Sequence, residues 1–160
     1  MTDPLSAAAA VAGLVVPALH GARLLLNDLE KITDAPKAVK GLEEDLASVG
    51  ASLESLKAIE EPQWYMLGDN VVERSKATIE TCATSCDAMR GDLQRWTRRS
   101  RDGKLSWRDR AKIGFFKERR VKSMSEQLQS CKLTMSSVVG VATLYVDNAA
   151  APDDTTSRPF

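Results

Sequence analysis

The chain of 160 residues is long enough for one domain with a hydrophobic core, and its 22 basic residues equal its 22 acidic residues. Because the net charge is zero, overall charge alone predicts neither a nucleic-acid partner nor an acidic one. The three cysteines are an odd number and fall at helical core spacing, which favours a reducing compartment over a disulfide framework.

The first predicted helix follows Pro4, runs to about Lys31 and contains Pro17, which is expected to kink it. Its stretch from Leu5 to Leu29 is nearly uncharged and exceeds the roughly 20 apolar residues that cross a bilayer. The only early charge is Asp3, so a cleaved secretory signal is not expected.

The same apolar residues also fit the seam of a soluble helical bundle. The predicted seam positions are Leu5, Ala8, Ala12, Val15, Leu19, Ala22, Leu26 and Leu29. The apolar positions off this seam are Val11, Leu14, Val16, Leu24 and Leu25. The helix is therefore apolar over more of its circumference than the edge of a bundle requires. Small residues, Ala9, Gly13, Pro17 and Gly21, also recur every four positions, a pattern that allows close helix approach in membranes or in a bundle.

The second predicted helix starts at Asp34 and Pro36 and ends before Pro62. Its seam is Val39, Leu42, Leu46, Val49, Leu53 and Leu56. A loop with Trp64, Tyr65 and Gly68 is expected to follow.

Two more helices follow, each with a predicted capping box at its start. Asn70 with Glu73 opens the third, whose seam is Val72, Ser75, Ile79, Cys82, Cys86, Met89, Leu93 and Trp96. Gly103 marks a turn. The fourth helix begins at Ser106 and Asp109, or restarts after Gly114, and stops by about Asp147. Its seam is Val121, Met124, Leu128, Cys131, Met135, Val138, Ala142 and Tyr145.

Four helices with matching seams predict an all-α fold, an antiparallel four-helix bundle over residues 1–147. Residues 148–160 contain two prolines, two aspartates and a Thr-Thr-Ser run, so a flexible or disordered tail is expected there.

Catalytic chemistry has little support, and no enzyme activity or cofactor is expected. The one histidine, His20, lies in the most apolar helix, and no phosphate-binding Gly-rich loop is present in the sequence. Cys82 and Cys86 lie one helical turn apart, a spacing that could place two thiolates on one metal, with Cys131 or His20 completing the site. Buried apolar cysteines are the better interpretation, so no metal site is predicted. His20 is expected to be partly buried.

The basic charge is concentrated between Arg90 and Lys122, where 13 basic and 4 acidic residues give a local net charge of +9. Basic side chains near anionic lipid contribute about 1 kcal/mol each, and tryptophan favours the bilayer interface. A solvated surface is the ordinary use of any one of these residues, and lipid is favoured over nucleic acid for the cluster. The predicted headgroup-docking residues are Arg98, Arg99, Arg101, Lys104, Trp107, Arg108, Arg110 and Lys112.

Three features of the chain resemble the HeLo-like N-terminal domain of fungal STAND, or NOD-like, receptors over about Asp3 to Tyr145. They are Asp3-Pro4-Leu5-Ser6 with Ala-Val-Ala-Gly-Leu at Ala10 to Leu14, the leucine-paced second helix, and the segment Leu128 to Met135. The resemblance implies a domain that executes programmed cell death in fungal innate immunity and heterokaryon incompatibility, by oligomerising and attacking the plasma membrane through its N-terminal helix. No nucleotide-binding module or repeat array follows within these residues, so the chain is either a truncated domain or a small effector.

Two functions follow as hypotheses. The first is a membrane-permeabilising cell-death effector that is cytoplasmic at rest and at the plasma membrane when activated. Its partners would be anionic lipids, further copies of itself and an upstream NOD-like receptor, with no nucleic acid. The predicted inserting residues are Leu5, Val11, Leu14, Val15, Val16, Leu19, Leu24 and Leu25. The alternative is a non-enzymatic adaptor whose bundle pairs with another helical domain.

Overall fold

The computed structural model describes residues 6–32, 35–96 and 111–150, and the described residues form five helices and no strand. The helices are α1 (Ala7–Glu30), α2 (Lys37–Lys57), α3 (Glu61–Leu67), α4 (Asp69–Trp96) and α5 (Ala111–Ala150). The predicted all-α fold is confirmed. Helix α5 continues three residues beyond the predicted end at Asp147, and the rest of the predicted tail, 151–160, lies outside the described residues.

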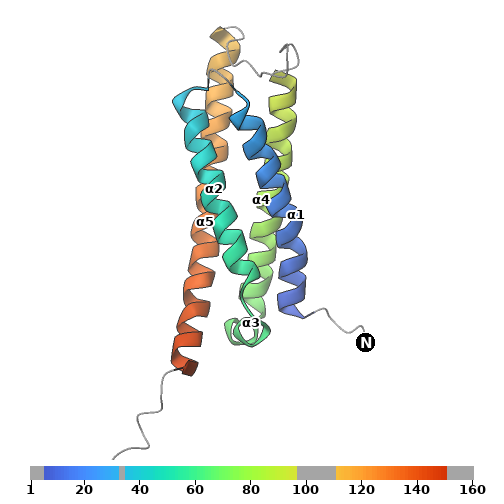
Figure 1. Cartoon of the computed structure of the whole chain (residues 1–160), viewed down its shortest axis with the longest axis vertical. Helices are drawn as coiled ribbons and strands as arrows, with labels where there is room; N and C mark the ends of the chain where they lie inside the picture. Colours follow the sequence, from blue (N-terminus) through green and yellow to red (C-terminus); the bar gives the residue numbers. More distant parts are fainter. Residues whose placement is uncertain (1–5, 33–34, 97–110, 151–160) are drawn as a thin grey trace, which may run out of the picture.

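The four long helices form an elongated bundle in which successive long helices run in opposite directions (Figure 1). Helix α1 packs against α2 and α4, and α5 packs against the same two helices from the other side. The link from α2 to α4 therefore crosses a diagonal of the bundle. The short helix α3 makes this crossing at the end where α1 begins, and it contacts α1, α4 and α5 (Figure 1).

Helix α3 replaces the loop that was predicted around Trp64 and Tyr65. Its start is stabilised by a capping box: the Glu60 side chain accepts from the Gln63 backbone N–H, and Gln63 Oε1 accepts from the Glu60 backbone N–H at 2.9 Å. Pro62 fits the first turn, where its missing N–H is no loss. Trp64 is 1% exposed, so this helix closes the end of the core.

The predicted capping box of Asn70 and Glu73 is wrong, because α4 already begins at Asp69. Gly68 adopts φ 91° at the end of α3, and its carbonyl accepts from the Val72 N–H at 3.2 Å. A positive φ is accessible to glycine without steric cost, so the chain turns directly from α3 into α4. The predicted cap at Ser106 and Asp109 lies outside the described residues.

The predicted seams of α2, α4 and α5 form the core. All six positions of α2 and seven positions each of α4 and α5 are buried; Trp96 and Tyr145, at the helix ends, are half-buried. The seam of α1 differs. Val11, Ala18 and Leu25 are fully buried, whereas Ala8, Ala12 and Leu26, which were predicted inside, are half-buried. In a helix that is apolar on every side, several sets of residues have three-four spacing. The pattern alone therefore did not determine which face of α1 packs against the bundle.

Candidate functional site

Helix α1 is the one helix of the described segments that is long and apolar enough to cross a membrane, and 39% of its most apolar window is buried. Among the predicted inserting residues, Val11, Val15, Leu19 and Leu25 lie in the core. Leu14 and Leu24 are half-buried. Leu5 lies outside the described residues. The predicted inserting set is thus divided between the core and the surface.

The solvent face of α1 carries small and apolar side chains. Val16 is 53% exposed, and Ala9, Gly13 and Pro17 are exposed beside it. The fourth residue of the small-residue row, Gly21, is buried against Cys86 and Asp87 of α4. From Ala7 to Ala22 the only ionisable side chain is His20, which is exposed and not partly buried as expected. A soluble bundle does not require an apolar outer face, so this face is the feature of α1 that its packing leaves unexplained.

Polar contacts hold α1 at both ends. At its start, the Glu61 carboxylate of α3 accepts from the backbone N–H groups of Ala7 at 3.3 Å and Ala8 at 2.7 Å. Near its end, Asp28 pairs with Arg90 Nε of α4 at 2.9 Å, with 21% and 27% of their side chains exposed. A third contact joins Arg23 to Glu54 of α2 at 3.2 Å, and both side chains are exposed to solvent.

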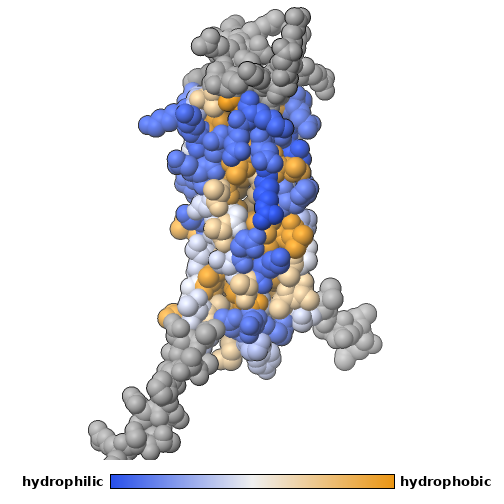
Figure 2. Space-filling view, in the orientation of Figure 1, coloured by the Kyte–Doolittle hydropathy of each residue, from blue (hydrophilic) through white to orange (hydrophobic). Residues whose placement is uncertain are grey.

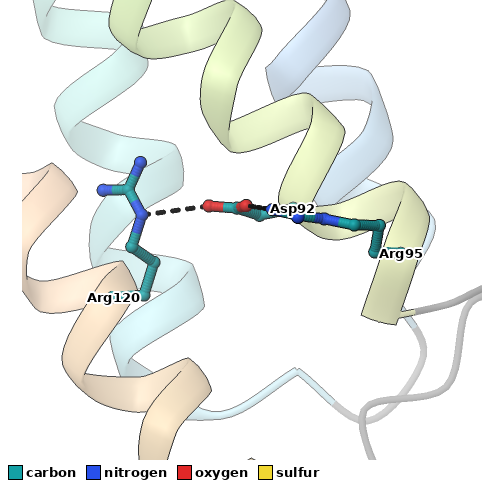
Figure 3. Close-up of polar contacts among 3 residues, drawn as sticks. All are labelled: Asp92, Arg95 and Arg120. Carbon is teal, nitrogen blue, oxygen red and sulfur yellow. Dashed lines mark hydrogen bonds and ion pairs between the residues drawn. The ribbon is translucent and has the colours of Figure 1, made fainter.

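The described part of the basic segment is largely committed to contacts within the protein. Asp92 of α4 lies between Arg95 of the same helix and Arg120 of α5, whose Nε is 3.0 Å away (Figure 3). Lys117 is 1% exposed, and its Nζ lies 5.9 Å from the centre of the Trp96 ring. The Arg120–Asp92 and Lys117–Trp96 contacts join α5 to α4.

The predicted headgroup-docking residues from Arg98 to Arg110 lie outside the described residues, and Lys112 lies in the first turn of α5. Helix α4, which precedes this segment, ends at the end of the bundle where α1 also ends, and α5, which follows it, begins there (Figure 1). The start of α1 lies at the opposite end, beside α3. Figure 2 shows hydrophilic side chains over most of the upper half of the visible face and paler, more apolar ones over much of the lower half.

The three cysteines are buried, as the seam positions predicted. The pKa of the Cys82 thiol is raised because it hydrogen-bonds Cys86 and is desolvated. Burial, with a smaller contribution from Cys82, raises the pKa of Cys131 to about 11. Thiols held protonated in this way are poor metal ligands and nucleophiles. Within the described segments, no three His, Cys, Asp or Glu side chains form a group that could hold a metal ion.

Two surface features were missed by the sequence reasoning. A groove of about 340 Å³ lies between α5 and the α3–α4 side, and it is lined by Leu67, Val71, Arg74, Leu133, Thr134, Ser137, Val138 and Val141. Leu133 and Leu144 on α5 are 72% and 60% exposed, and Tyr65 on α3 is 84% exposed. A second groove of about 250 Å³ lies between α1 and α2 beside Gly50 and the Arg23–Glu54 pair. Exposed leucines on one helix, spaced outside the core seam, were the signal available in the sequence.

These features define a helical-bundle domain with an apolar N-terminal helix. A family model described as "Pigment biosynthesis cluster protein PigL N-terminal" matches residues 2–154. The chain therefore belongs to this family, PigL_N, which is a fungal domain family. No curated protein and no solved structure matches the chain.

Proposed function

We propose that this domain is a non-enzymatic membrane-permeabilising effector of the HeLo-like kind, which acts in fungal cell death when clustered. The observation that carries the proposal is α1: an outer face with Val16 53% exposed, on a helix whose ionisable residues other than His20 are confined to its last third. Moving such a helix from the bundle into lipid keeps its buried side chains out of water and removes its exposed apolar side chains from water as well.

The proposed motion is a swing of α1 about its own C-terminal end. At that end of the bundle α4 ends and α5 begins (Figure 1), and the basic segment that joins them in the chain is proposed to rest on anionic headgroups of the plasma membrane. The helix has 24 residues. At 1.5 Å per residue it is about 36 Å long, which is enough to cross a hydrocarbon core of about 30 Å. At rest the proposed location is the cytoplasm, with α1 folded against the bundle.

Clustering is part of the proposal because removing α1 uncovers apolar side chains of its two neighbours. Ile79 and Cys86 of α4 and Leu46 and Leu53 of α2 are all at most 2% exposed in the closed bundle. Further copies of the domain would cover these surfaces, and an upstream NOD-like receptor is the proposed means of bringing copies together.

The test substitutes Val16→Glu in a domain clustered by a C-terminal oligomeriser and measures leakage of vesicles with and without phosphatidylserine. Val16 lies near the middle of α1 and is 53% exposed, so the folded domain should tolerate the carboxylate. A charge at the bilayer centre costs roughly 2.5–3.5 kcal/mol, so leakage should fall about 100-fold.

The matched control is Leu144→Glu, which places the same charge on a position of α5 that is 60% exposed and outside the groove. It should melt and leak like the unchanged protein. Full leakage by Val16→Glu would remove α1 from the mechanism. Equal leakage of neutral and anionic vesicles would remove the basic segment. Leu14, which the sequence placed outward, is a poorer probe because it packs partly against the core.

A second candidate, a non-enzymatic adaptor, is favoured by the apolar groove between α5 and the α3–α4 side. An adaptor would use this groove to pair with another helical domain and would need no lipid. Absence of leakage under every clustered condition would favour it over the effector.

A further inference from the structure

We infer that α3 is an autoinhibitory clasp, in which the Glu61 carboxylate holds the start of α1 closed against the bundle. The inference rests on the proposed function for its consequence, the release of α1 toward lipid, but the clasp itself is a property of the bundle. We call the contact of Glu61 with the N–H groups of Ala7 and Ala8 the Glu61 clasp.

The first four N–H groups of a helix have no carbonyl partner inside it. In α1, whose N-cap is Ser6, the first ordinary helical bond runs from the Ala10 N–H to the Ser6 carbonyl at 2.9 Å. Of the earlier N–H groups, that of Ala9 donates to the Ser6 side-chain oxygen at 3.1 Å, and those of Ala7 and Ala8 donate to Glu61. The negative carboxylate also lies at the positive end of the helix dipole. The start of α1 is therefore completed by another helix, 53 residues away in the chain from Ala8.

Helix α3 is itself anchored to the rest of the bundle. Gln63 Nε2 donates to the Ala142 carbonyl of α5 at 3.1 Å, and Trp64 is 1% exposed. Because Glu61, Gln63 and Trp64 lie within one turn, α3 joins the start of α1 to α5 and to the core. Lifting α1 away requires either the Glu61 clasp to break or α3 to leave with it.

The position of the clasp fits a swing about the far end of α1. The Asp28–Arg90 pair, at 2.9 Å and largely shielded from water, holds α1 near its C-terminal end. The third tie, Arg23–Glu54, is exposed with 69% and 51% of the side chains accessible, and exposed pairs contribute little. Breaking the Glu61 clasp therefore frees α1 from its start to near Asp28, while the Asp28–Arg90 pair keeps its C-terminal end attached.

The test compares Glu61→Ala with Glu54→Ala, each of which removes one carboxylate that contacts α1. The capping box of α3 uses Glu60 and Gln63, so α3 keeps its own start in Glu61→Ala. Hydrogen exchange without lipid should then accelerate by about tenfold or more from Ala10 through Leu25, the change expected from losing charge-assisted hydrogen bonds to one carboxylate. Glu54→Ala should exchange like the unchanged protein. Glu61→Gln, which keeps the shape without the charge, should be intermediate and guards against a folding defect.

Vesicle leakage separates the clasp from the proposed function. Glu61→Ala should release the contents of phosphatidylserine-containing vesicles without an added oligomeriser. Faster exchange through Leu25 with no leakage, even from the clustered unchanged protein, would keep the clasp and reject the effector function. Faster exchange confined to Ala7 and Ala8 would show that Glu61 is only a helix cap and would overturn the inference.

Discussion

The rotation of α1 in the bundle can be tested with two adjacent leucines. Leu25 is fully buried, whereas Leu26 is half-buried and lines the groove between α1 and α2. Truncation of Leu25 to Ala leaves a cavity in close-packed surroundings, for which the cost is about 2–5 kcal/mol. Truncation of Leu26 to Ala widens a groove that is already open, so only part of the transfer free energy is lost, about 1 kcal/mol.

Thermal and urea unfolding, both followed by circular dichroism, measure the loss of stability in each of the two variants. For a chain of 160 residues, each kcal/mol shifts Tm by roughly 2–4 °C, so Leu25→Ala should lower Tm by about 4–20 °C. The dependence of the free energy of unfolding on urea should be equal in the two variants, because both unfold the same surface. A larger loss for Leu26→Ala would place α1 in the rotation that three-four spacing suggested and would refute the packing described above.

Two further predictions concern glycines and the pH dependence of stability. Gly50→Ala should stabilise the bundle by about 0.5–1 kcal/mol, because an added Cβ meets nothing within 4 Å in the interior of α2. Gly68→Ala should destabilise it by about 1 kcal/mol or more, because φ is 91° there; equal Tm changes for the two would contradict the assignment. Burial raises the pKa of Cys131 from 9.0 to about 11, so the fold favours the protonated thiol. The contribution of this thiol to the free energy of unfolding is therefore complete below pH 9 and is lost as pH rises from 9 to 11. Urea titrations across this range should show a fall in stability that is smaller in Cys131→Ala; an equal fall would assign the effect to other groups.

Sequence pattern predicted the fold well where polar and apolar residues alternate strongly. Between the buried positions of α2 from Val39 to Leu56, every residue is charged, serine, alanine or glycine, so one rotation buries the large apolar side chains and the others do not. In α1 the contrast is lost, and Leu25 was placed outside and Leu26 inside. Helix α3 has only seven residues, Glu61–Leu67, and the Pro62 in its first turn and the Gly68 after its end are also typical of a loop, which is what the sequence predicted there. The spacing of Glu60 and Gln63 was the signal for a helix start.

The candidate site was predictable only in part, because its contacts join distant segments. The apolar character of α1 is visible in the sequence, but the partner of its first turn, Glu61, is not. That contact depends on the diagonal crossing by α3, and four helices of similar seam admit several orders around the bundle. The +9 segment was found from composition, yet Arg90 and Arg120 prove to be structural, since each pairs with an aspartate of a neighbouring helix.

The distribution of these contacts along the bundle bears on how the domain could remain closed and still open. Ion pairs gather where α1 ends and α4 meets α5, so that end resists separation. At the opposite end, α1 is held by the Glu61 carboxylate of a seven-residue helix, through exposed hydrogen bonds to the Ala7 and Ala8 N–H groups. Water competes for these exposed hydrogen bonds, whereas the Asp28–Arg90 pair is largely shielded from it. The end of the bundle where α1 begins should therefore open before the end where it stops.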